Sequence, residues 1–123
     1  MSRGVLRQAR IALDSGNFAL ADSLAMSVLR WDLSNLEGLK IRTLALEALG
    51  KLSYAAITSS QAGVVSGDGA YYEQAAEFQI RLDQLDSAAW SLREAAGLYR
   101  EAALPDKARA AEARASCLGD GNH

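Results

Sequence analysis

The sequence contains one cysteine, one histidine and one proline among 123 residues. A single Cys117 excludes an internal disulfide and a cysteine-rich metal site, so we interpret it as a small core residue in a reducing compartment. His123 is the last residue, where nothing would hold it as a general base or metal ligand. Thirteen basic residues do not exceed fifteen acidic ones, which disfavours a nucleic-acid partner.

Long apolar runs are also missing. Arg7 and Arg10 interrupt the N-terminal sequence before an apolar stretch of signal-peptide length develops, and no run is long enough to cross a membrane. We therefore expect a cytoplasmic protein that neither carries a cleaved export signal nor contacts a membrane.

Motifs for catalysis or cofactor binding are absent. The patterns HExxH, GxSxG and GxxxxGK[ST] do not occur, and Gly67-Asp68-Gly69 lacks the third glycine of a dinucleotide loop. We read that segment as a turn in which Asp68 caps the next helix. Glu73 and Glu77 have a spacing that could hold a metal, but no histidine joins them, so a solvated helix face is favoured. The sequence predicts a protein that is not an enzyme and has no cofactor or metal.

Alanine and leucine dominate what is present. There are 24 Ala and 18 Leu, against ten β-branched Val, Ile and Thr residues. Ala and Leu favour helices, whereas strands draw on β-branched residues, so we predict an all-α fold. Apolar periodicity and capping residues divide residues 1–119 into one domain with about seven antiparallel helices, followed by a frayed tail at 120–123. The predicted helices are 3–15, 17–30, 35–49, 52–65, 70–83, a helix capped at 86–87 and ending near 103, and 105–118.

Ser34-Asn35 offers an N-cap for the helix at 35–49. This helix has little polar face, so we expect it to be buried on two sides. The chain also repeats itself at a lag of 34 residues, and small residues recur where paired helices would come closest. The superposed sets are Gly16, Gly50 and Gln84; Ala21, Ala55 and Ala89; and Val28, Ala62 and Ala96.

This pattern resembles the tetratricopeptide repeat (TPR), which has a small residue in the hairpin turn, an aromatic two positions later and alanines in the second helix. Gly16-Asn17-Phe18 with Ala21 matches best, and Gly50-Lys51-Leu52 with Ala55 matches second. The third repeat, at Gln84 to Ala89, has lost the glycine and the aromatic. The proline that usually ends each repeat is replaced by Leu33 and Gly67. The resemblance implies three helical hairpins over about 2–103, wound as a right-handed superhelix, and a C-terminal capping helix.

The resemblance also implies a concave groove lined by the first helix of each hairpin. The family's carboxylate clamp, which uses Lys and Asn, is not matched, because Leu6 and Arg10 stand at those positions. Tyr71 and Phe78 are expected to be exposed as binding anchors, whereas Phe18, Trp31, Tyr54, Trp90 and Tyr99 are expected in the core. The groove residues carried over from the family are Arg3, Leu6, Arg10, Leu13, Glu37, Lys40, Leu44, Glu47, Tyr71, Gln74, Phe78 and Arg81.

Two functions remain open at this point. One is a non-catalytic protein-protein interaction module, of the adaptor or assembly-chaperone type, that binds a peptide or protein segment in the groove. The other is a structural homodimer, in which the apolar helix at 35–49 or the alanine-rich helices after residue 86 pack against a second copy.

Overall fold

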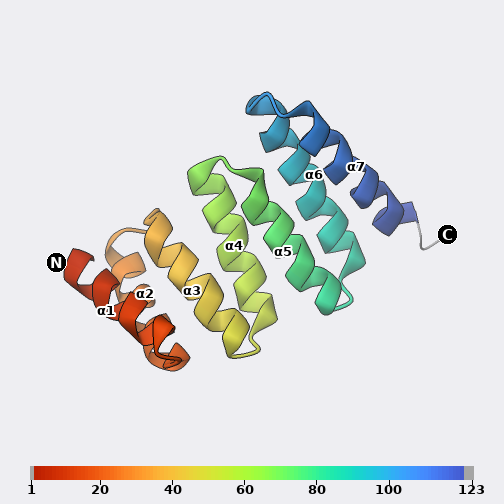
Figure 1. The fold of residues 1–123 in the computed structure, drawn as a ribbon. Coiled ribbons are helices and arrows are strands. Elements are labelled where there is room, and N and C mark those ends of the chain that lie inside the picture. Colours follow the sequence, from red (N-terminus) through yellow and green to blue (C-terminus); the bar gives the residue numbers. More distant parts are fainter. Residues whose placement is uncertain (1, 121–123) are drawn as a thin grey trace.

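The computed structural model describes residues 2–120, which form seven helices stacked side by side along the chain (Figure 1). Each helix packs against the next one, and α1 also contacts α3. Short turns make neighbouring helices antiparallel. The helices are α1 (Ser2–Asp14), α2 (Phe18–Trp31), α3 (Leu36–Ala48), α4 (Leu52–Ser66), α5 (Gly69–Arg81), α6 (Leu85–Glu101) and α7 (Pro105–Asp120).

Capping residues set several helix starts as the sequence predicts. Asn35 accepts a hydrogen bond from the Gly38 amide at 2.8 Å, and Asp68 accepts one from the Ala70 amide at 2.9 Å. The expected cap of α6 at 86–87 is wrong, because α6 already begins at Leu85, after a turn closed by backbone hydrogen bonds. Helix α7 extends through residue 120, and the rest of the predicted tail, 121–123 with His123, lies outside the described residues.

One turn geometry recurs at four helix ends. In the α1–α2 turn, the Gly16 amide donates to the Leu13 carbonyl and the Asn17 amide to the Ala12 carbonyl, and the same pair of bonds recurs after α3, α5 and α6. The motif needs one residue with positive φ. The residues that adopt it are Gly16 (φ 83°), Gly50 (φ 76°), Asp83 (φ 59°) and Ala103 (φ 60°).

These turns correct the repeat register in the third hairpin. The positive-φ residue there is Asp83, which follows Gly50 by 33 residues, so Gln84 is not the structural equivalent of Gly50. The equivalent of Ala55 is accordingly Ala88 rather than Ala89. Aspartate is among the few residues besides glycine that visit this conformation readily, which explains how the third hairpin keeps its turn without a glycine.

The core runs along the stack of helices as a series of small clusters rich in alanine. Ile41 and Ala45 of α3 pack into a cluster with residues of α1 and α2, while Leu46 packs with Ala55 of α4 and Phe78 of α5. Helix α3 is therefore buried on two sides, as predicted. The hairpin alanines Ala21, Ala55 and Ala88 are each fully buried.

Several aromatic residues do not lie where the sequence analysis places them. Tyr99 is buried and Phe18 is half-buried, but Trp31 is 90% exposed, and Tyr54 and Trp90 are more than half exposed. Contacts between alanines leave little space for large rings inside the stack, so these rings lie on its surface.

Cys117 is exposed, not a core residue. The buried positions of α7 are Ala108, Ala111 and Ala115, and Cys117 lies two residues, about 200° of helix rotation, beyond the last of these. Among residues 2–120, no helix is long and apolar enough to span a membrane.

We predict that Ala55→Leu lowers the free energy of unfolding by about 1–3 kcal/mol, because Ala55 is fully buried where α4 packs on α3 and α5. Ala19→Leu, at an exposed position of α2, is the control and should change it far less. Urea denaturation of both variants tests this, and equal losses would refute the assigned contact.

We also predict that Ala103→Gly raises the free energy of unfolding by about 1 kcal/mol, because glycine removes the cost of a Cβ at positive φ. Ala102→Gly, at the neighbouring residue with φ −86°, should give no gain. A thermal melt in which the two variants are alike would show that the α6–α7 turn differs from the one described.

Candidate functional site

The predicted groove residues come from one side of α1, α3 and α5. Within each helix they are spaced by three or four residues, so they share a face. All of them except Phe78 are exposed or half-buried. We call this face, without Phe78, the inner surface. It comprises Arg3, Leu6, Arg10 and Leu13 of α1, Glu37, Lys40, Leu44 and Glu47 of α3, and Tyr71, Gln74 and Arg81 of α5.

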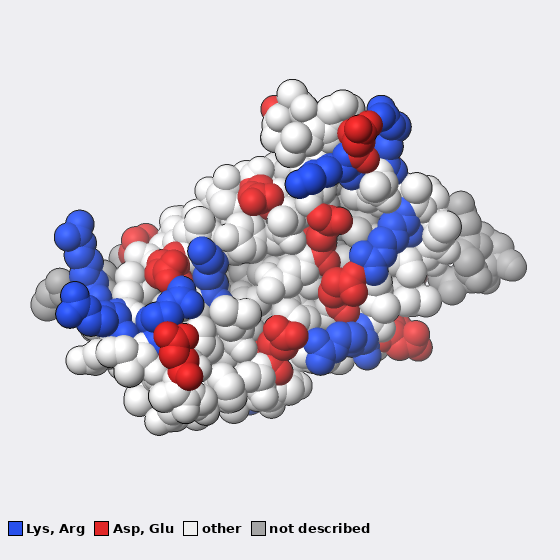
Figure 2. All heavy atoms as spheres, viewed as in Figure 1, with Lys and Arg blue, Asp and Glu red and all other residues white. Residues whose placement is uncertain are grey.

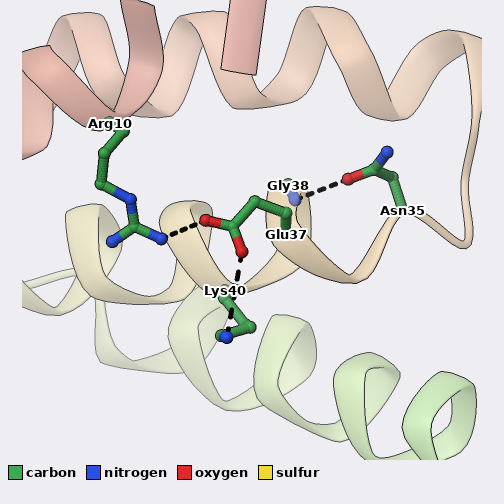
Figure 3. A network of polar contacts seen from close by, with 5 residues as sticks. All are labelled: Arg10, Asn35, Glu37, Gly38 and Lys40. Atoms are coloured by element: carbon green, nitrogen blue, oxygen red, sulfur yellow. Dashed lines mark hydrogen bonds and ion pairs between the residues drawn. The ribbon is translucent and has the colours of Figure 1, made fainter. Parts of the chain in front are cut away.

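A polar network links α1 to α3 on the inner surface (Figure 3). The Arg10 guanidinium donates a hydrogen bond to Glu37, and the Lys40 ammonium lies 3.9 Å from the other oxygen of the same carboxylate. Asn35 caps α3 at the Gly38 amide beside this network and so fixes the turn that carries Glu37. One carboxylate thus holds two of the predicted groove cations.

A second ion pair links α3 to α5, where Arg81 donates to Glu47 at 3.2 Å. The series continues with Glu77 of α5 and Arg114 of α7. These side chains are roughly half exposed, so each pair contributes about 0–1 kcal/mol to stability. Figure 2 shows basic and acidic side chains next to one another across the face in view. The inner surface itself presents mixed charge, because its four basic residues, Arg3, Arg10, Lys40 and Arg81, lie with two acidic ones, Glu37 and Glu47.

Apolar side chains lie between the charges. Leu6 and Leu13 are half-buried against the cluster of α1, α2 and α3, while Leu44 of α3 is 40% exposed. Tyr71 is half-buried against Leu29 and the other residues of its cluster, so its expected partial exposure is confirmed. Leu6, Leu13 and Tyr71 are therefore held by core packing while part of each side chain stays accessible for contact.

Gln74 is less available than the sequence suggests. Its side-chain oxygen lies 2.8 Å from the hydroxyl of Ser59, which also lies 2.6 Å from the Tyr71 carbonyl oxygen. Ser59 is fully buried, so this hydroxyl joins α4 to the inner side of α5. Gln74 therefore helps to position Tyr71.

The expected exposure of Phe78 is wrong. Its side chain is only 2% exposed and packs against Leu46 of α3 and Ala55 and Ala56 of α4. On the α5 helix, Phe78 is three residues beyond buried Ala75, and this places it on the core side. The family position therefore carries a core residue in this chain.

The carboxylates of Glu73 and Glu77 on α5 each contact a side chain of another helix. Tyr99 of α6 donates a hydrogen bond to Glu73, and Glu77 pairs with Arg114. Burial, followed by the Glu73 contact, raises the pKa of the Tyr99 hydroxyl, so it remains a donor. Among residues 2–120, no group of three His, Cys, Asp or Glu side chains could hold a metal ion.

Sequence reasoning missed a cavity of about 450 Å³ among α2, α3 and α4. Leu29 and Leu39 line it, together with the exposed residues Leu33 and Val64. The signal was the pair Val64-Val65 and Leu33, apolar residues that fall outside the predicted helix-packing positions.

Several solved structures are similar to this chain. PcrH in complex with the chaperone binding region of PopD superposes with a TM-score of 0.73 at 16% identity, over 98% of this chain and 92% of that one. A T3SS complex from Aeromonas hydrophila gives 0.74 at 16%, over 97% and 83%. The Yersinia enterocolitica type III secretion translocator chaperone SycD gives 0.70 at 15%, over 96% and 85%.

No protein-family model matches the sequence, and no curated protein matches it. The structural matches cover nearly the whole chain, and they confirm the TPR-like, all-helical fold predicted from the repeat.

We predict that Phe78→Ala lowers the free energy of unfolding by about 3–5 kcal/mol, because it empties a fully buried site between three helices. Leu44→Ala, on the exposed side of α3, is the control and should lower it by much less. Chemical denaturation measures the free energy of unfolding of both variants. A small loss of stability for Phe78→Ala would show that the Phe78 ring lies on the inner surface and not in the core.

Proposed function

We propose that this chain is a non-catalytic binding protein that holds a segment of another protein against the inner surface. The observation that carries the proposal is the full-length superposition on PcrH, a structure solved with the chaperone binding region of PopD. An adaptor or assembly-chaperone role fits a small stack of helices in which the remaining residues pack the helices together.

The chemistry of the inner surface defines the segment. Leu6 of α1, Leu44 of α3 and Tyr71 of α5 offer apolar contacts on three alternate helices, which suits an extended segment with apolar side chains at intervals. The pairs Arg10–Glu37 and Glu47–Arg81 lie beside these contacts, where they can turn to polar groups of the segment. Mixed charge disfavours a uniformly acidic or basic partner.

A homodimer is the second candidate. Within one copy, Ile41, Ala45 and Leu46 of α3 are buried, as are Ala95 and Ala96 of α6 and Ala108 and Ala111 of α7, while Leu44 of α3 remains 40% exposed. The observation that favours self-association lies at α1 and α2, where Ile11 is 60% and Leu20 is 45% exposed beside a cavity of about 330 Å³.

We predict that Leu44→Glu reduces capture of the partner at least tenfold while leaving the fold intact, because a carboxylate on α3 would lie unpaired against apolar side chains of the segment. Ile57→Glu, on α4 and 55% exposed, is the matched control and should retain capture. The measurement is quantitative affinity capture from host cells with the tagged chain and both variants, followed by mass spectrometry and a melting curve for each variant.

A partner lost from both variants, or retained by both, would contradict binding at the inner surface. If no protein is enriched by the unaltered chain and its solution mass is twice that of one copy, the homodimer replaces the proposal.

A further inference from the structure

A separate cavity of about 370 Å³ opens between α4, α5 and α6. None of its lining residues belongs to the inner surface. They are Val64 of α4, Tyr72 of α5, and Glu94, Gly97, Leu98 and Glu101 of α6.

Helix α6 forms one wall of the cavity. Glu94, Gly97 and Glu101 follow one another at intervals of three and four residues, so they lie on a single face. Gly97 lies between the two glutamates, about 4.5 Å along the helix axis from Glu94 and about 6 Å from Glu101. A group bound over Gly97 is therefore within reach of both glutamates.

Both carboxylates lack a cation. Within the part of the chain that the structure describes, the side chains of Glu94 and Glu101 form no ion pair and no hydrogen bond, whereas the nearby Arg100 pairs with Glu112. The side chain of Arg93 lies toward Gly119 of α7. The cavity thus carries two negative charges that the protein does not neutralise itself.

Tyr72 adds a polar group to the opposite wall. It is only 6% exposed, and its ring is fixed against Gly63 and edge-on to Trp90, with centroids 6.1 Å apart. Its hydroxyl makes no hydrogen bond within residues 2–120, and no fully enclosed polar side-chain atom there is left without a partner, so the hydroxyl of this lining residue keeps some access to solvent. Burial, followed by the Glu94 charge, raises the pKa of Tyr72 and keeps the hydroxyl protonated.

Gly97 has no packing reason to be glycine. A Cβ at this position would meet nothing within 4 Å, unlike one at Gly63 or Gly69. Glycine inside a helix lowers stability relative to alanine, so the residue weakens α6 without relieving a clash. Because Gly97 has no side chain, it leaves the helix backbone uncovered between the carboxylates of Glu94 and Glu101.

We propose that this cavity binds an arginine side chain of a partner protein. The aliphatic part of the arginine would lie on Leu98 and Val64, and the guanidinium over Gly97 would donate to Glu94, Glu101 and the Tyr72 hydroxyl oxygen. Arginine suits the site better than lysine, because its planar group carries five donors that can serve separated acceptors. This second site makes no use of the inner surface and does not depend on the function proposed for it.

The test is an NMR titration of the full chain with the tripeptide Ac-Leu-Arg-Leu-NH₂ and with its uncharged citrulline analogue. We expect saturable shifts at the Gly97 amide with millimolar affinity for the arginine peptide, and at least tenfold weaker binding of the citrulline peptide. Glu94→Gln and Glu101→Gln should each weaken binding about threefold, whereas Asp14→Asn, the same charge change on α1, should leave it unaltered.

Gly97→Ala separates binding from stability. It should raise the melting temperature and weaken the arginine peptide at least fivefold, because its methyl group occupies the floor of the cavity. Unchanged binding by this variant, or equal binding of the two peptides, would overturn the proposal. Agmatine, a small free guanidine, binding as tightly as the peptide would overturn the assignment to a partner protein and point to a small-molecule ligand. Gly97 shifts that grow with protein concentration alone would assign it to a second copy.

Discussion

The close approach of neighbouring helices through alanine and glycine is the constraint on which the rest of the structure depends. Ala21, Ala55 and Ala88 are fully buried at equivalent points of three hairpins. At Gly69 the approach is closer still, because a Cβ there would lie 2.7 Å from the Ala95 carbonyl oxygen. Such contacts let short helices bury their backbones against one another, but each cluster remains small, so stability is distributed along the stack.

The same constraint determines which residues are left for binding. A core filled by alanine cannot take many large side chains, so Trp31, Leu33 and Val64 lie on the surface, and Leu44 remains partly exposed on the inner surface. Ion pairs such as Arg10–Glu37 and Glu47–Arg81 bridge helices that are not consecutive in the chain. They keep the charged side chains beside the apolar ones, and this mixture gives the inner surface its suitability for a protein segment.

Helix positions could be read from the sequence because local chemistry sets them: the glycine turns at 16 and 50, and the caps at Asn35 and Asp68, are properties of a few adjacent residues. The 34-residue lag places the α5–α6 turn one residue too late, because Asp83 adopts positive φ and no glycine marks the position. Phe78 is buried where exposure is expected, and Trp31 is exposed where burial is expected. The burial of a side chain depends on how the helices cross, which a 34-residue lag does not specify. The cavity beside Gly97 is not predictable from the sequence for the same reason, because residues of three helices, α4, α5 and α6, form its walls.

Side-chain footprinting by hydroxyl radicals, applied to this chain with and without its captured partner, tests the central claim most directly. Binding at the inner surface predicts that Leu6, Leu44 and Tyr71 become protected, while Trp31 and Ile57, exposed on α2 and α4, keep their reactivity. Protection of Trp31 and Ile57 with no change at Leu44 and Tyr71 would contradict it.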